Sequence, residues 1–137
     1  MKKNKIKTLG SGSFSSVYLV TLTHSNDLCA LKRLNKNDYE SFKNEISLLM
    51  KLNHPNILPI NDYYESKKFY NIILPYAKCG TLFNLIEKRK KKNTIFYFED
   101  IKIISLAISR GLNYLHENKI IHCDIKPSNI LLFGNKI

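Results

Sequence analysis

Eleven residues from His122 to Leu132 carry the side chains best suited to chemistry; they read His-Cys-Asp-Ile-Lys-Pro-Ser-Asn-Ile-Leu-Leu. Asp124 can accept a proton from a hydroxyl, Lys126 can neutralise a phosphoryl group, and Asn129 offers an amide oxygen to Mg²⁺. Pro127 lacks an N–H and disfavours a helix, so we expect a loop that leads into a short buried strand. The set suits phosphoryl transfer, although a lone Asp in a polar loop is more often a turn former.

A glycine-rich stretch near the N-terminus, residues 9–20, reads Leu-Gly-Ser-Gly-Ser-Phe-Ser-Ser-Val-Tyr-Leu-Val. Its glycines precede a strand of alternating character. Because a glycine has no Cβ, such a hairpin can bring backbone N–H groups close to phosphate oxygens. A bare Gly-x-Gly is more often an ordinary hairpin, so this stretch gains weight only from the motifs around it.

Lys32 and Glu45 are the next candidates, one on a predicted strand and one on the helix that follows it. The helix is predicted over residues 37–52 with Asn37 as its cap, and Glu45 lies beside its apolar face. That position would let Glu45 reach Lys32. A lone Lys on a strand is usually exposed to solvent, and the Glu has the alternative of being an ordinary surface charge.

The remaining hydrophobic patterns predict the elements that must position these groups. Strands are expected over residues 28–34, 58–65 and 69–74, and further helices over 81–88 and 98–118. In the last helix the apolar residues cover more than one face, so we expect it to be buried on most sides.

The composition indicates a globular protein that can bury one core or two small ones, with 137 residues, 44% hydrophobic and 24% charged. No apolar run has the roughly 18 residues that a membrane span needs, and the N-terminus lacks the apolar core of a signal peptide. The three cysteines include no Cys-x-x-Cys pair, which speaks against a disulfide framework and a zinc site. We expect a soluble intracellular protein in the cytoplasm, with the nucleus as the alternative and no membrane partner.

The net charge of +11 raises nucleic acid as a partner. All but three of the 22 basic residues are Lys, however, which indicates codon bias as much as selection. The densest basic run, residues 88–92, lies between two helical patterns and is expected to be a solvated loop. Nuclear targeting or nucleic-acid contact is the weaker interpretation of that run.

Residues 122–132 resemble the catalytic loop of eukaryotic protein kinases, in which His-Arg-Asp is followed by a Lys two residues on and then by an Asn. The resemblance implies that Asp124 is the catalytic base, that Lys126 contacts the transferred phosphate, and that Asn129 ligates Mg²⁺. A Lys at position 126 favours the Ser/Thr type. Cys123 stands where the family usually has the Arg that pairs with a phosphorylated activation loop.

The resemblance extends through the N-terminal half and implies an ATP site. Cys-Ala-Leu-Lys, ending at Lys32, is similar to the kinase Val-Ala-Ile-Lys, and thirteen residues that begin at Glu45 look like the C-helix and its exit turn. The family then implies that Lys32 holds the α and β phosphates and pairs with Glu45. By the same resemblance, the nucleotide-binding positions are Leu9, Gly10, Ser11, Gly12, Val17, Ala30, Lys32, Leu74, Pro75, Ala77 and Leu131.

Within this set, Leu74 corresponds to the gatekeeper, and the carbonyl of Pro75 and the backbone of Ala77 face the adenine edge. Leu131 closes the adenine pocket from below. Ser15 replaces the third glycine of the loop, which predicts a weaker hold on the phosphates.

The fold class implied is α+β and protein-kinase-like, with a five-stranded antiparallel N-lobe, a C-helix and an incomplete helical C-lobe. The expected domains are the N-lobe over 1–74, a hinge over 75–80, and a partial C-lobe with the catalytic loop over 81–137.

The printed chain ends at Ile137, before the family's Asp-Phe-Gly motif. We therefore expect a truncated form or a fragment, in which Asn129 is the remaining protein ligand for the metal and transfer is badly impaired. Whether this chain is an enzyme is left open. The first hypothesis is a Ser/Thr kinase that acts on protein substrates when completed. The second is an inactive kinase-like module that docks to a kinase or a kinase substrate through the exposed face of its long helix. The third, a nucleic-acid binder, rests on charge alone. The oligomeric state is unknown.

Overall fold

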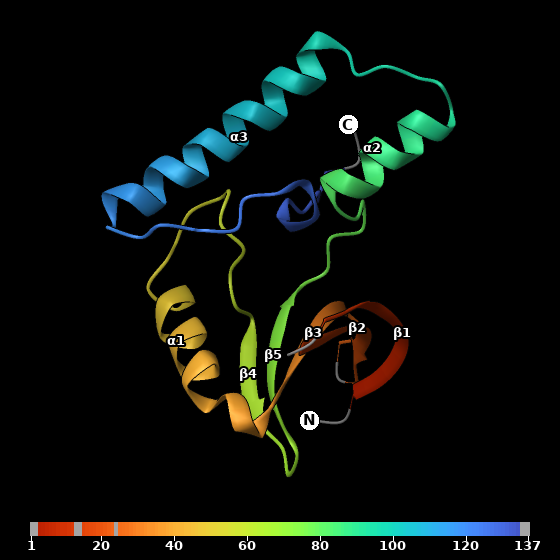
Figure 1. The fold of residues 1–137 in the computed structure, drawn as a ribbon. Coiled ribbons are helices and arrows are strands. Elements are labelled where there is room, and N and C mark those ends of the chain that lie inside the picture. Colours follow the sequence, from red (N-terminus) through yellow and green to blue (C-terminus); the bar gives the residue numbers. More distant parts are fainter. Residues whose placement is uncertain (1–2, 13–14, 24, 135–137) are drawn as a thin grey trace. The chain divides into compact units, whose positions relative to one another are not determined.

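Five strands rich in branched and aromatic residues form one antiparallel sheet, in the order β1-β2-β3-β5-β4 (Figure 1). The structure is a computed structural model that describes residues 3–12, 15–23 and 25–134. Within these residues the strands are β1 Lys3–Ser11, β2 Ser15–Leu22, β3 Leu28–Asn35, β4 Asp62–Glu65 and β5 Phe69–Pro75.

The chain divides into two compact units. Unit 1 consists of Met1–Asn53 and Ile57–Tyr76 and contains the whole sheet together with helix α1, Tyr39–Leu49. Unit 2 consists of His54–Asn56 and Ala77–Ile137 and contains the other helices.

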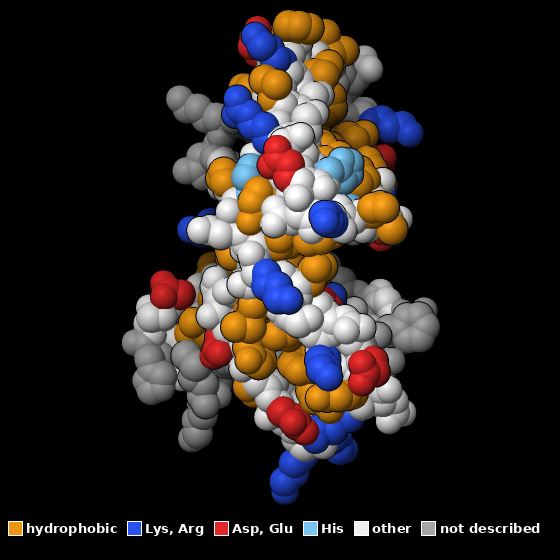
Figure 2. Space-filling model, turned by 90° about the vertical axis from the view of Figure 1, so that its left-hand side faces the viewer, with side chains coloured by type: hydrophobic (Ala, Val, Ile, Leu, Met, Phe, Trp, Pro, Cys, Tyr) orange, Lys and Arg blue, Asp and Glu red, His pale blue; other side chains and the backbone are white. Residues whose placement is uncertain are grey.

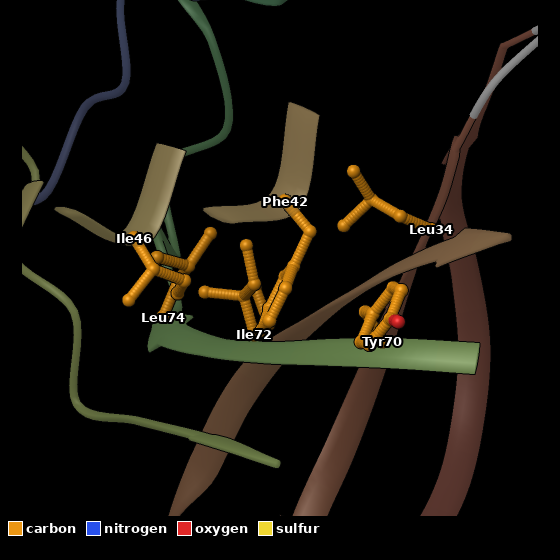
Figure 3. Close-up of a cluster of buried hydrophobic side chains, with 7 residues drawn as sticks. Leu34, Phe42, Ile46, Tyr70, Ile72 and Leu74 are labelled. Carbon is orange, nitrogen blue, oxygen red and sulfur yellow. The ribbon is translucent and has the colours of Figure 1, made fainter. Parts of the chain in front are cut away.

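The core of unit 1 lies between α1 and one face of the sheet. Side chains from β3, α1 and β5 point toward one another in this cluster (Figure 3). The ring of Phe42 stacks on that of Tyr70 with centroids 4.4 Å apart, and Ile72 beside them is completely buried. The buried members are Ala30, Leu34, Phe42, Ile46, Tyr70, Ile72 and Leu74.

The opposite face of the sheet has its own apolar cluster, built from the alternate residues of the same strands. Its buried members are Val20, Cys29, Leu31 and Ile73. Because β3 and β5 lie inside the sheet and carry buried residues on both faces, each contains a run of consecutive apolar residues instead of a simple alternation.

Helix α1 is shorter than the sequence predicted. Asn37 is not its cap, because residues Lys36–Asp38 form a separate 3₁₀ turn and the α-helix begins at Tyr39. At the other end, Lys51 N bonds to Leu48 O and Leu52 N to Leu49 O, the tighter pattern in which helices commonly end.

Strand β4 was predicted over 58–65 but spans only Asp62–Glu65. Pro59 has no N–H to donate to a neighbouring strand, so the residues around it cannot pair regularly. Pairing begins after it, where Asn61 N donates to Ile73 O at 2.9 Å.

Unit 2 contains helix α2, Leu82–Lys91, helix α3, Phe98–Glu117, and a 3₁₀ turn at Pro127–Asn129. Thr81 caps α2, since its hydroxyl accepts a hydrogen bond from Asn84 N at 3.1 Å.

The prediction of a loop for the basic run was wrong, because residues 88–91 form the last turn of α2. Cations are favourable there because the C-terminal end of a helix carries partial negative charge.

Helix α3 leaves much of its apolar surface exposed, although its apolar pattern by itself is typical of a helix buried on most sides. In the described part of the chain, its buried residues are Ile104, Gly111 and Leu115, whereas Ile101 and Ile103 keep about half of their surface exposed, at 51% and 56%. Neither α3 nor any other helix in the described ranges is long and apolar enough to cross a membrane.

Truncation of Ile72 tests the core of unit 1. We expect Ile72→Ala to lower the free energy of unfolding by about 2–5 kcal/mol, because the side chain is fully buried and would leave a cavity. Ile6→Ala, at a position that is half exposed in β1, is the control and should cost less than about 1 kcal/mol. Urea denaturation followed by circular dichroism measures both, and equal losses would contradict the assignment of the core.

Candidate functional site

The predicted ion pair of unit 1 is formed. Lys32 Nζ lies 2.7 Å from both Oε1 and Oε2 of Glu45, and each side chain is about three-quarters buried, with 26% exposed. Lys32 belongs to β3 and faces α1, which carries Glu45. Partial burial strengthens the attraction between the charges, and a two-oxygen contact directs the ammonium group.

Three predicted adenine contacts share the same face of the sheet. Ala30 is paired with Leu74 across β3 and β5, and Val17 packs against the apolar cluster that contains both. Val17 is also paired with Lys32 across β2 and β3. The structure therefore brings an apolar surface and a cation together within unit 1.

The glycines at 10 and 12 lie where β1 approaches the hairpin to β2. Gly10 is paired with Val17 and Ser11 with Ser16, and Gly12 N donates to Ser15 O at 2.8 Å. Leu9, Gly10, Ser11 and Gly12 are all exposed. Residues 13 and 14 lie outside the described part.

In unit 2 the three polar groups of the catalytic-loop motif form a connected cluster. Asp124 Oδ2 accepts hydrogen bonds from Lys126 Nζ and Asn129 Nδ2, each at 2.8 Å. Asn129 Nδ2 also donates to the backbone carbonyl of Asp124 at 2.8 Å. All three side chains are exposed, so the cluster is open to a reacting group.

A tight turn places Asp124 in this cluster. Cys123 has φ +61°, a left-handed conformation that is uncommon for a residue with a side chain. On the far side of the turn, His122 Nδ1 accepts a hydrogen bond from Asp124 N at 3.2 Å. The sequence analysis assigned His122 no such role, although a His two residues before the Asp was the available signal.

The segment after the loop is tied to the start of α2. Leu82 N donates to Ile130 O and Leu132 N to Gly80 O, both at 2.9 Å. The buried strand predicted over 130–132 is reduced to a single bridge between Leu131 and Thr81, because only residues 79–82 pair with it. Leu132 is buried, Leu131 is 36% exposed, and the predicted hinge residue Ala77 is buried in the same unit.

The predicted site residues thus fall into two sets. Unit 2 holds Ala77, Leu131 and the Asp124 cluster. The other predicted residues lie in unit 1; they are Leu9, Gly10, Ser11, Gly12, Val17, Ala30, Lys32, Glu45, Leu74 and Pro75. Among the described residues, no group of three or more His, Cys, Asp or Glu side chains could hold a metal ion.

A depression of about 390 Å³ on unit 2 contains none of the predicted site residues. It lies along α3 beside His54, whose ring stacks on that of Tyr114 at 4.9 Å. Its walls include Arg110 and Glu117.

The hydrogen bonds from Lys126, and then from Asn129, hold the pKa of the Asp124 carboxyl below its ordinary value. Asp124 therefore stays ionised well into the acid range. Because the pKa of Asp124 is lower in the folded than in the unfolded state, its ionised form stabilises the folded state at pH values above the ordinary pKa of Asp. This contribution is lost as the pH falls through the lowered pKa of the folded state.

Removal of the Lys126 ammonium should raise the pKa of Asp124 toward its ordinary value. We expect this shift in Lys126→Met, measured by NMR titration of the Asp124 carboxyl carbon. Lys119→Met, at an exposed position in the same unit, is the control and should leave the titration unchanged. An unaltered titration in Lys126→Met would show that the ion pair is not formed in solution.

Comparison with known proteins finds relatives along nearly the whole chain. The family model of the protein kinase domain matches residues 3–137. Calcium-dependent protein kinase 4 of Plasmodium falciparum is 36% identical over 133 residues, which cover 93% of this chain and 24% of that protein. Mouse serine/threonine-protein kinase Nek3 is 33% identical over 132 residues, which cover 95% of this chain and 25% of that protein. The chain therefore spans about a quarter of the length of these relatives.

The fold agrees with the same assignment. A crystal structure of Rad53 1-466 in complex with AMP-PNP superposes with a TM-score of 0.84 and 25% identity, over 97% of this chain and 35% of that one. The kinase-like α+β fold predicted from the motifs is thereby confirmed. The chain belongs to the protein kinase family, and its relatives place it with the eukaryotic-type serine/threonine kinases.

Proposed function

We propose that a protein containing this chain binds ATP with Mg²⁺ and transfers the γ-phosphate to serine or threonine hydroxyls of protein substrates. The ion pair between Lys32 and Glu45 is the single observation that carries the proposal. When a helix carboxylate pairs with a Lys that lies inside a sheet, the ammonium group of that Lys points in a defined direction. The ammonium group of an ordinary surface Lys does not. Kinases require that pair to orient the nucleotide phosphates.

The residues of unit 1 fit a nucleotide. Val17, Ala30 and Leu74 form an apolar surface suited to a purine ring, and Lys32 on the same face supplies positive charge for phosphates. The exposed backbone at Gly10 and Gly12 can approach phosphate oxygens because no Cβ intervenes.

The residues of unit 2 fit the acceptor. The ionised carboxylate of Asp124 can accept a hydrogen bond, and then the proton, from a substrate hydroxyl. Lys126 Nζ, now paired with that carboxylate at 2.8 Å, can turn to a phosphoryl oxygen. Asn129 uses its amide nitrogen to bond Asp124, which leaves Oδ1 for Mg²⁺. Bound Mg²⁺ would neutralise charge on the phosphates.

The alternative is an inactive kinase-like module that docks to a protein partner. It is favoured by the apolar residues that α3 exposes, among them Ile101 and Ile103. A partner that co-purifies in stoichiometric amount and survives Lys32→Ala would support docking without nucleotide. Loss of the partner in that variant would speak against it.

Nucleotide affinity tests the part assigned to unit 1. We expect Lys32→Met to weaken binding of Mg²⁺ and a non-hydrolysable ATP analogue about tenfold or more, because a charge-assisted contact with the phosphates is lost. Isothermal titration calorimetry measures the affinity. Lys36→Met is the matched control, since Lys36 also pairs with a glutamate, Glu65, but at an exposed place. Equal affinities in the two variants would contradict the role of Lys32.

Phosphoryl transfer tests the part assigned to unit 2. In a protein that contains this chain and is active, Asp124→Asn should lower the transfer rate by roughly 10²- to 10⁴-fold, because an amide cannot take up the proton. Nucleotide affinity should be unchanged. The rate is measured as phosphate incorporated into a protein substrate, and activity that persists in this variant would remove Asp124 from the role of base.

A further inference from the structure

The basic run contains one residue with a structural role and four that are free of such a role. Arg89 points inward: its guanidinium bonds Asp100 Oδ2 at 2.8 Å and the carbonyl of Ile95, and lies over the ring of Phe96 at 4.6 Å. The four lysines around it are exposed. They are Lys88, Lys90, Lys91 and Lys92.

Arg89 also fixes the connection between α2 and α3. Its backbone carbonyl accepts a hydrogen bond from Thr94 N at 2.9 Å, and Asn93 takes a left-handed conformation, with φ +51°, to make the turn. Tyr97 N lies 3.4 Å from Asp100 Oδ2, the carboxylate that Arg89 holds. The connection therefore has a defined shape.

That shape turns three large apolar side chains outward. Ile95, Tyr97 and Phe98 are 76%, 70% and 74% exposed, whereas Phe96 between them packs on Arg89. With most of their surface open to solvent, these three residues form a projection instead of a groove. We call the four lysines and these three residues the α2–α3 tip.

The charge around the tip is mostly positive, although Glu87 and Glu99 flank the segment. Residues 88–98 contain no Asp or Glu, the nearby Asp100 is neutralised by Arg89, and Glu99 lies 3.9 Å from Lys102. Figure 2 shows one face of the molecule, on which basic side chains lie among polar and hydrophobic ones. The tip combines concentrated positive charge with protruding apolar and aromatic groups.

We propose that the α2–α3 tip binds the surface of a membrane that contains anionic lipid. Ile95, Tyr97 and Phe98 would enter the interface between headgroups and acyl chains, where aromatic rings are favourable, and the lysines would contact lipid phosphates and carboxylates. A projection suits a bilayer, whereas a peptide partner is usually held in a groove. The sequence-based expectation of no membrane partner rested on the lack of a spanning segment, which peripheral binding does not need.

Co-sedimentation of the 137-residue chain with lipid vesicles tests this proposal independently of catalysis. We expect binding to phosphatidylcholine vesicles that contain about one third phosphatidylserine, little binding to phosphatidylcholine alone, and weaker binding at high salt. Replacement of the four exposed lysines by Gln should reduce binding about fivefold for each lysine removed. Lys67→Gln with Lys68→Gln, two exposed lysines of the β4–β5 turn, is the control and should change little.

Substitutions of the apolar residues separate lipid from other acidic partners. Ile95→Ser should weaken vesicle binding about fivefold or more, because it removes a hydrocarbon side chain that the membrane would bury and leaves the charge unchanged. Tyr97→Leu with Phe98→Leu should retain vesicle binding but would abolish stacking on nucleic-acid bases. Equal binding to neutral and anionic vesicles, or no effect of Ile95→Ser, overturns the proposal. If the chain bound a single-stranded oligonucleotide tightly, and Tyr97→Leu with Phe98→Leu lost that binding, the α2–α3 tip would be assigned to nucleic acid instead.

Discussion

The packing of α1 on the sheet is the interaction on which the charged pair of unit 1 depends. Phe42 and Ile46 bury one side of the helix against Tyr70 and Ile72. Glu45 is the neighbour of Ile46 in the chain, so the same contact that buries Ile46 places the carboxylate over β3. Hydrophobic burial by itself has no preferred direction. Because the helix is rigid, however, burial of Ile46 also fixes the position of the neighbouring Glu45 carboxylate.

The cluster in unit 2 is held by a different kind of interaction. Asp124, Lys126 and Asn129 lie within six residues and contact one another directly, around a turn that requires a left-handed residue at Cys123. Its geometry comes from short-range hydrogen bonds, with Leu131 and Leu132 tied to the start of α2. The candidate site residues thus comprise one pair set by long-range packing and one cluster set by local structure.

The distribution of basic residues shows why net charge says little about function. Lys32 supports the nucleotide site that we propose, Arg89 stabilises the α2–α3 connection, and Lys36 pairs with Glu65 at the surface. The lysines around Arg89 instead concentrate exposed positive charge beside exposed apolar groups. The overall value of +11 could not distinguish these roles.

The sequence alone was enough to predict the family, the antiparallel sheet and, through the family resemblance, the pairing of Lys32 with Glu45, because the motifs lie at fixed spacing along the chain. The roles of the individual site residues remain predictions. Tertiary structure decided the ends of the elements, such as the late start of β4 and the extension of α2 through the basic run. It also decided which residues face solvent: Arg89 turns inward to Asp100, and Ile95 turns outward. Those outcomes depend on partners distant in the chain or on the geometry of a turn, which residue type and spacing do not specify.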